Sequence, residues 1–77
     1  PTAEVYKAAN ELKVIIYNND DFRFAEAQAA FVSKDCKLYL QPEWSKRDKM
    51  MPAIVDYVMK NPKWIVSLQT HKYLNIP

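Results

Sequence analysis

The sequence predicts an α/β protein in which three parallel strands alternate with two helices in the order β-α-β-α-β. Three apolar runs support this prediction because they begin at equal intervals of 26 residues, at Leu12, Leu38 and Trp64. Parallel strands need a connection of about a dozen residues or more, usually a helix. Both intervals are long enough to supply one.

The predicted strands cover residues 12–17, 37–41 and 64–68. Their side chains are mostly apolar, often β-branched, and show little alternation between polar and apolar positions. That pattern is typical of strands buried on both faces of a parallel sheet. We therefore expect one parallel three-stranded sheet.

The first interval predicts a helix over residues 22–32. The segment Asn18–Asp21 precedes it with residue types that favour a helix N-cap. Phe24, Ala27 and Phe31 then recur at helical spacing.

The second interval predicts another helix, which opens with a capping pattern at Ser45–Asp48 and ends at Asn61-Pro62. Pro52 is unusual there, because proline removes an N–H and crowds the carbonyl group four residues earlier. Either the first turn is irregular or the regular helix begins near Met51. The residues expected to form one apolar face are Met51, Ile54, Val55 and Val58.

A further short helix is predicted across Thr2 to Ala9. Right-handed crossovers place both crossover helices on the same face of the sheet, so the other face and one edge stay uncovered. In a (β/α) barrel that face is the packed interior. We therefore expect residues 1–77 to be one part of a partial TIM-like barrel. Alone, this part should self-associate to cover apolar surface, and the assembly expected for the protein is a homodimer.

Composition excludes several classes of function. Eleven basic and nine acidic residues give a net charge of +2, too little for a nucleic-acid footprint. Glycine is absent, which excludes Gly-rich phosphate loops. No apolar run is long enough to span a bilayer. The single cysteine, Cys36, cannot form an internal disulfide and indicates a reducing cytoplasm, and one Cys with one His predicts no metal site.

Polar segments follow all three predicted strands: Tyr17–Asn19, Gln41–Trp44 and Gln69–Lys72. The carboxyl ends of parallel strands meet at one edge, where ligands collect in α/β proteins. The amides of Gln41 and Gln69 can each donate and accept. His71 and Lys72 could position an anion or move a proton. The sequence therefore predicts a binding site at this edge.

Simpler interpretations remain open beside this one. From the residues alone, a lone histidine such as His71 is more often solvent-exposed or structural than catalytic. The other candidates are interpreted structurally: Glu43 and Ser45 as the start of a helix, Asp20 and Asp21 as a cap, Trp44 and Trp64 as packing residues, and Cys36 as an inert small apolar group.

Three segments in this order, Glu11–Ile16, Leu38–Trp44 and Ser67–Tyr73, resemble the C-terminal third or more of the 7-carboxy-7-deazaguanine synthases. These are radical S-adenosylmethionine enzymes of 7-deazapurine biosynthesis. The similarity extends over nearly the whole chain. Its most specific part is the Gln-Thr-His-Lys sequence shortly before Pro77.

The resemblance implies a partial barrel whose [4Fe-4S] cluster is held by three cysteines near the N-terminus. It further implies cleavage of S-adenosylmethionine and, with Mg²⁺ assisting, ring contraction of 6-carboxy-5,6,7,8-tetrahydropterin to 7-carboxy-7-deazaguanine. The present sequence has none of those cluster cysteines. We therefore expect a C-terminal fragment that is inactive alone and needs the missing N-terminal part as its partner.

By the same resemblance, Gln69, His71 and the Pro77 carboxylate would lie towards the pterin, and Lys72 adjoins them. Gln41 would lie towards S-adenosylmethionine. Two other hypotheses remain: a stand-alone α/β module that binds other proteins, and a substrate-binding subunit whose partner chain supplies the cluster.

Overall fold

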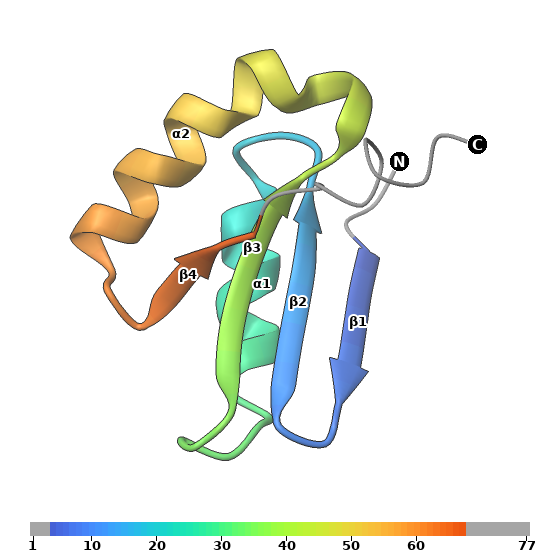
Figure 1. Ribbon diagram of the computed structural model, residues 1–77, viewed down its shortest axis with the longest axis vertical. Coiled ribbons are helices and arrows are strands. Elements are labelled where there is room, and N and C mark those ends of the chain that lie inside the picture. Colours follow the sequence, from blue (N-terminus) through green and yellow to red (C-terminus); the bar gives the residue numbers. More distant parts are fainter. Residues whose placement is uncertain (1–3, 68–77) are drawn as a thin grey trace.

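The computed structural model describes residues 4–67, which form a four-stranded sheet covered by two α-helices (Figure 1). The strands are β1 (Glu4–Ala8), β2 (Glu11–Ile16), β3 (Lys37–Pro42) and β4 (Trp64–Val66), and the helices are α1 (Asp21–Ala29) and α2 (Arg47–Lys60). The strand order across the sheet is β1-β2-β3-β4. None of the helices within residues 4–67 is long and apolar enough to cross a membrane.

The predicted β-α-β-α-β core is confirmed. Strands β2, β3 and β4 are parallel neighbours, and α1 and α2 are the two crossovers between them. Leu12 is paired with Leu38, which is paired with Trp64. The equal spacing of the three apolar runs thus places their first residues side by side across the sheet.

The short helix predicted across Thr2 to Ala9 is wrong. Residues Glu4–Ala8 instead form β1, which pairs antiparallel with β2. Val5 lies opposite Val14 and packs against the core, so the segment gains apolar contact as a strand. Its backbone also satisfies the edge of β2 that would otherwise be unpaired.

The first crossover helix is confirmed as α1, but the residues whose helical spacing predicted it do not form its buried face. Phe24, Ala27 and Phe31 are exposed, and Phe31 keeps 79% of its surface accessible. The buried face is formed instead by Ala25, with Ala29 packed beside it against the core. Both are small side chains, which let the helix approach the sheet closely.

The second crossover helix begins before Met51, the start that one of the two alternatives predicted. A 3-10 turn at Trp44–Lys46 leads directly into α2, and Pro52 lies inside the helix. A helix start near Met51 is therefore wrong, and the irregularity is the 3-10 turn before α2. The predicted cap at Ser45–Asp48 is replaced by the Glu43 side chain, which accepts a hydrogen bond from Ser45 N at 2.9 Å.

Part of the apolar face predicted for α2 is confirmed. Ile54 is fully buried, and Val58 packs against the core. Val55 is 40% exposed, and Met50, one turn before Ile54, is buried in its place. The inward stripe is therefore rotated from the predicted one.

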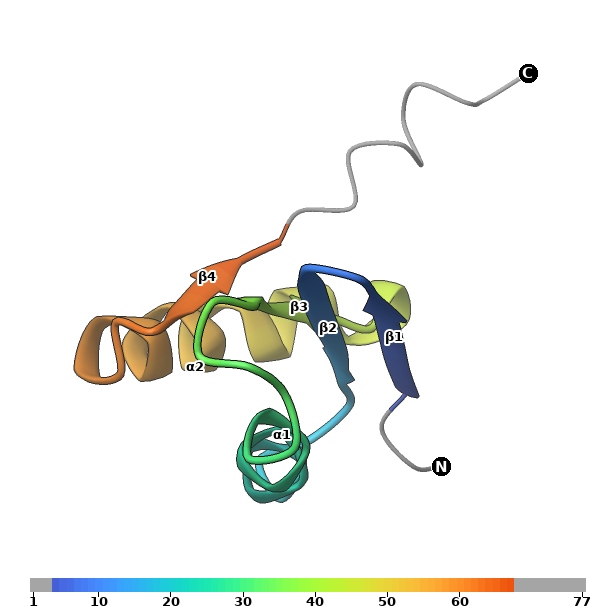
Figure 2. The same ribbon diagram turned by 90° about the horizontal axis from the view of Figure 1, so that it is seen from below.

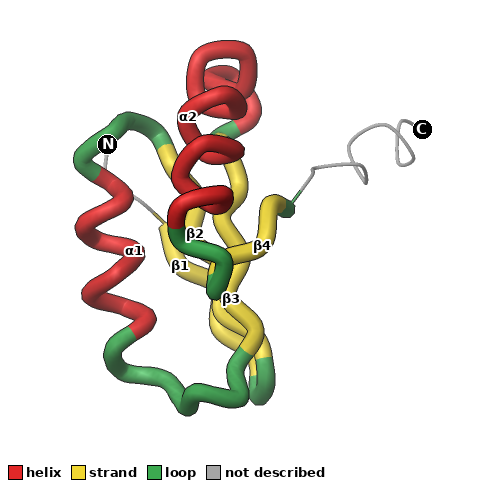
Figure 3. Tube along the Cα trace, turned by 90° about the vertical axis from the view of Figure 1, so that its left-hand side faces the viewer, coloured by secondary structure: helices red, strands yellow, loops and turns green. Residues whose placement is uncertain are grey.

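Both helices cover the same face of the sheet (Figures 2 and 3). Every second side chain of β2 and β3, together with Trp64 of β4, points into the space between the sheet and the helices. The buried residues of the core are Leu12, Val14, Ile16, Ala25, Leu38, Leu40, Met50, Ile54 and Trp64. Alternation then places the intervening residues on the opposite face.

That opposite face carries a row of four paired residues, Tyr6, Lys13, Tyr39 and Ile65, one from each strand. Tyr6 and Ile65 are 55% and 42% exposed. No described helix covers this row, as the crossover rule predicts. We refer to it below as the open face.

Candidate functional site

The described parts of the predicted site lie together at one edge of the sheet. Strands β2, β3 and β4 run parallel, so their carboxyl ends meet at the same edge, the upper one in Figure 1. Two backbone hydrogen bonds join the segments beyond them: Glu43 N donates to Ile16 O at 2.9 Å, and Ser67 N donates to Leu40 O at 2.8 Å. We call this edge the rim.

Gln41 is a buried polar residue of the rim. It pairs with Ile15 across the sheet and keeps only 4% of its surface exposed. Because Leu40 points into the core, alternation places Gln41 on the open face. The Oγ–H of Ser67 donates to Gln41 Oε1 at 3.0 Å. Within residues 4–67 this contact engages the amide oxygen and leaves the amide N–H groups turned away from Ser67.

Asp21 fixes the loop that follows β2. Its Oδ2 accepts hydrogen bonds from Tyr17 N at 2.6 Å and Asn18 N at 3.1 Å, and its side chain is buried. The predicted capping role is thus wrong for this residue, and the residue at the N-cap position, Asp20, makes no side-chain cap. The carboxylate instead satisfies backbone donors of the rim, which local capping rules do not reveal.

Tyr17 contributes a phenol to the same edge. Partial burial, together with the nearby carboxylates of Glu4 and Glu43, raises the pKa of Tyr17 above its ordinary value. The phenol therefore stays protonated at neutral pH and is able to donate.

The segment after β3 is structural, as predicted for Glu43 and Ser45. The Glu43 carboxylate accepts hydrogen bonds from both the backbone N and the hydroxyl of Ser45. Arg47 lies over the Trp44 ring, 4.0 Å from its centroid, and donates to Trp44 O at 2.7 Å. Trp44 is only half-buried, whereas Trp64 is a core residue as predicted.

The remaining predicted site residues lie outside the described part of the chain. They are Gln69, His71, Lys72 and Pro77. Their assignment to a pterin stays a prediction. The described chain reaches Ser67, two residues before Gln69 and already at the rim.

A second polar cluster lies away from the rim, near the start of β4. Glu26 of α1 accepts hydrogen bonds from Tyr57 of α2, from Lys63 Nζ at 2.6 Å and from Trp64 Nε1 at 2.9 Å. We call these four residues the Glu26 cluster. The three donors lie 31 to 38 residues after Glu26 in sequence, so no local motif reveals the cluster.

The protonation states of the Glu26 cluster follow from these contacts. Burial alone would raise the pKa of Glu26, but the hydrogen bonds from Lys63, Tyr57 and Trp64 lower it below its ordinary value. Burial and the bond to Glu26 raise the pKa of Tyr57 to about 12. Glu26 is therefore charged and Tyr57 neutral at physiological pH. The cluster links α1 to α2 and β4.

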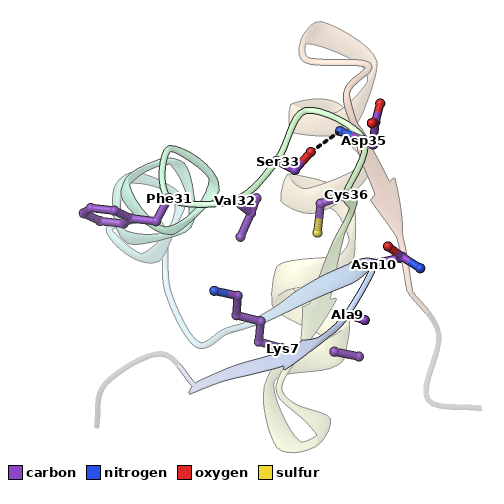
Figure 4. A pocket seen from close by; sticks show the side chains of 9 residues that line it. Lys7, Ala9, Asn10, Phe31, Val32, Ser33, Asp35 and Cys36 are labelled. Carbon is purple, nitrogen blue, oxygen red and sulfur yellow. Dashed lines mark hydrogen bonds between the residues drawn. The ribbon is translucent and has the colours of Figure 1, made fainter.

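The opposite edge of the sheet has a small pocket beside Cys36, with a volume of about 160 Å³ (Figure 4). Its lining is Lys7, Ala8, Ala9, Asn10, Phe31, Val32, Ser33, Asp35 and Cys36. Asp35 N donates to Ser33 Oγ at 3.1 Å. The few polar groups do not converge on one point, and the volume is below the usual range for small-molecule sites.

Within residues 4–67, no group of three or more His, Cys, Asp or Glu side chains is arranged to hold a metal ion. The 77-residue sequence has one cysteine. Cluster iron is normally held by several thiolates. The donor set of this chain therefore does not fit an iron–sulfur cluster.

Comparison with known proteins identifies close relatives. No family model matches the sequence, and no solved structure matches the chain. A 7-carboxy-7-deazaguanine synthase of Flavobacterium psychrophilum is 70% identical over 77 residues, which is all of this chain and 37% of the relative.

Two cyanobacterial proteins of the same name also match. The Synechocystis protein is 46% identical over 76 residues, covering 99% of this chain and 36% of the relative. The Prochlorococcus marinus protein is 30% identical over 92 aligned residues, covering 99% of this chain and 40% of the relative. The chain thus spans well under half the length of these relatives.

Proposed function

This chain belongs to the 7-carboxy-7-deazaguanine synthase family, and from that premise we propose that it is the C-terminal, substrate-side part of such an enzyme. The observation that supports this most strongly is the 70% identity over the full chain. Because the chain spans 37% of that relative, we propose that these residues are inactive alone.

The one-sided sheet supports a partial (β/α) barrel in the whole enzyme. Both helices pack on one face, and the open face exposes Tyr6 and Ile65. In a barrel this face would line the interior. The rest of the enzyme would then cover residues that the described chain leaves exposed.

The proposed reaction is the ring contraction of 6-carboxy-5,6,7,8-tetrahydropterin to 7-carboxy-7-deazaguanine in a radical S-adenosylmethionine enzyme that also uses Mg²⁺. When bound, the [4Fe-4S] cluster would supply the electron that cleaves S-adenosylmethionine. The present residues do not fit that cluster, so its ligands and those of Mg²⁺ would lie on the missing N-terminal part.

The role proposed for this chain is binding and orientation. A buried amide at the rim suits a polar ligand, so Gln41 would contact S-adenosylmethionine. Gln69, His71 and Pro77 would contact the pterin, with Lys72 adjoining them.

The substrate-side residues are tested by Gln69→Ala and His71→Ala in the full-length enzyme. Each should weaken pterin binding or slow turnover by about tenfold or more, because a buried polar contact to the ligand is lost. The iron content and the cluster spectrum should stay unchanged. Wild-type kinetics in both variants would remove these residues from the site.

The whole proposal is tested by anaerobic EPR of the reduced, reconstituted full-length enzyme, with and without S-adenosylmethionine. We expect a [4Fe-4S] signal that changes when S-adenosylmethionine is added, together with formation of the deazaguanine product from the pterin. An enzyme with no cluster signal and no product would overturn the proposal.

The open face favours one alternative, a stand-alone module that binds protein through this surface. The row Tyr6, Lys13, Tyr39 and Ile65 offers apolar and aromatic area to a partner. Homodimerisation of the enzyme is a related proposal. Sedimentation of the purified full-length protein distinguishes the two. A homodimer has twice the mass of one chain with no other protein present, whereas a module that binds other proteins has the mass of one chain.

A further inference from the structure

We infer that Ser67 is a positioning residue that fixes the amide of Gln41 so that its N–H groups, and not its oxygen, face S-adenosylmethionine. The inference rests on the proposed function for the identity of the ligand. Neither residue alone suggests it; the contact between the two strand ends does.

The backbone holds Ser67 in place beside Gln41. Val66 pairs with Leu40, and Ser67 N donates to Leu40 O at 2.8 Å. That bond extends the β3–β4 ladder by one residue beyond β4. Ser67 is therefore fixed next to the strand position that Gln41 occupies.

The side chains complete the contact on the open face. Ser67 Oγ lies 3.0 Å from Gln41 Oε1, and Gln41 is only 4% exposed. A side chain so deeply buried has little freedom to exchange its partner for water. In this contact the hydroxyl donates to the amide oxygen, so the N–H end of the amide lies away from Ser67.

This choice sets the polarity that a ligand meets. A glutamine side chain has an acceptor oxygen at one end and two N–H donors at the other. With Oε1 engaged by Ser67, the donors remain for the ligand. The carboxylate, ribose oxygens and ring nitrogens of S-adenosylmethionine can each accept a hydrogen bond, so any of these atoms suits a site that presents N–H groups.

The test measures S-adenosylmethionine binding to the full-length reconstituted enzyme by anaerobic equilibrium dialysis. Ser67→Ala should raise the Kd about fivefold, the order expected for the loss of one oriented hydrogen bond. Ser67→Thr keeps the hydroxyl and should restore most of the affinity. The matched control is Ser33→Ala, which removes another hydroxyl that makes one hydrogen bond, far from the rim.

A double-mutant cycle separates positioning from a general structural role. In a Gln41→Ala background, Ser67→Ala should have no further effect on the Kd, because its target is absent. Gln41→Glu is the sharper variant. Its carboxylate still accepts from Ser67 but offers no N–H group, so it should bind S-adenosylmethionine no better than Gln41→Ala.

The outcomes are distinct. Three results would each overturn the inference: an unchanged Kd in Ser67→Ala, an equal loss of affinity in the Gln41→Ala background, or a Gln41→Glu variant that binds as tightly as the wild type. The proposed function would still stand in these cases, provided that the wild-type enzyme binds S-adenosylmethionine. A wild-type enzyme that binds no S-adenosylmethionine would overturn both. If Ser67→Ala fails to fold, Gln41→Glu still tests whether the amide N–H groups bind the ligand, and Ser67→Thr still tests the hydroxyl: wild-type binding by Gln41→Glu would overturn the inference.

Discussion

The rim and the Glu26 cluster are both polar, but they differ in how completely their polar groups are satisfied. The Glu26 carboxylate accepts from three donors, Tyr57 in α2 and the adjacent residues Lys63 and Trp64. The Gln41 amide is bound at its oxygen by Ser67. A carboxylate that the fold surrounds with donors serves stability, whereas a buried amide that the described residues bind only at its oxygen is suited to a ligand.

Among the variants considered, removal of the Trp64 side chain should cause the largest loss of stability. Trp64 is 1% exposed and also donates to Glu26. Trp64→Ala should lower the free energy of unfolding by about 3–5 kcal/mol, because it leaves a large cavity. Urea unfolding of the full-length protein, followed by circular dichroism, measures this.

The matched control is Phe31→Ala, which removes an aromatic side chain that is 79% exposed. It should change the free energy of unfolding by less than about 0.5 kcal/mol. Equal losses in the two variants would mean that the core is not organised around Trp64 as described.

A crossed pair of variants sharpens the comparison. Gln41→Ala should weaken S-adenosylmethionine binding about tenfold with little loss of stability, because it removes the proposed ligand contact. Glu26→Gln should lower stability and leave the Kd unchanged, since the Glu26 cluster lies away from the rim. Both variants are measured by equilibrium dialysis and by urea unfolding. If affinity and stability fall together in both variants, the rim and the Glu26 cluster do not have separate roles.

Acid titration probes the Glu26 cluster alone. The folded-state pKa of Glu26 is lowered from its ordinary 4.5, so its charged form contributes stability above pH 4.5 that is lost as the pH falls through the lower folded value. The urea midpoint of the wild type should therefore fall more steeply between pH 5 and pH 3 than that of Glu26→Gln. Parallel profiles would contradict the lowered pKa.

The smallest effect is expected at an exposed ion pair. Lys60 Nζ lies 3.2 Å from Asp56 Oδ2, and both side chains are mostly exposed. Asp56→Asn should cost about 0.3–0.5 kcal/mol at most and less in high salt, because solvent screens such pairs. Urea unfolding at low and high salt measures this effect. A decrease of more than about 1 kcal/mol in the free energy of unfolding would contradict the weak contribution expected of an exposed ion pair.

The parallel core could be predicted from the sequence because its signals are long and repeated. The runs at Leu12, Leu38 and Trp64 are equally spaced, and the intervals between them fit crossover helices. The strand Glu4–Ala8 could not be recognised in this way. It is short, lies at the sheet edge and gains its stability from pairing with β2.

The face of α1 shows a different limit. Phe24 and Phe31 lie at helical spacing, and so do Ala25 and Ala29. Hydrophobicity alone favours the phenylalanines, but the small alanines let the helix lie close to the sheet. Which stripe turns inward depends on the fit to β2 and β3, and that is a tertiary property.

The shared edge of the three parallel strands was predictable, but the contacts at that edge were not. Parallel topology predicts that the ends of β2, β3 and β4 share one edge, and this is confirmed. Ser67 and Gln41 are 26 residues apart, and Glu26 and Trp64 are 38 apart. Hydrogen bonds over such separations follow from the folded register and from no local pattern.

The equal intervals between the strands also bear on the order of folding. Each parallel pair joins residues a full crossover apart, so its formation must first close a long loop. The antiparallel pair β1–β2 needs only the turn at Ala9 and Asn10. We therefore expect this hairpin to form earliest, with β3 and then β4 added as each crossover helix completes.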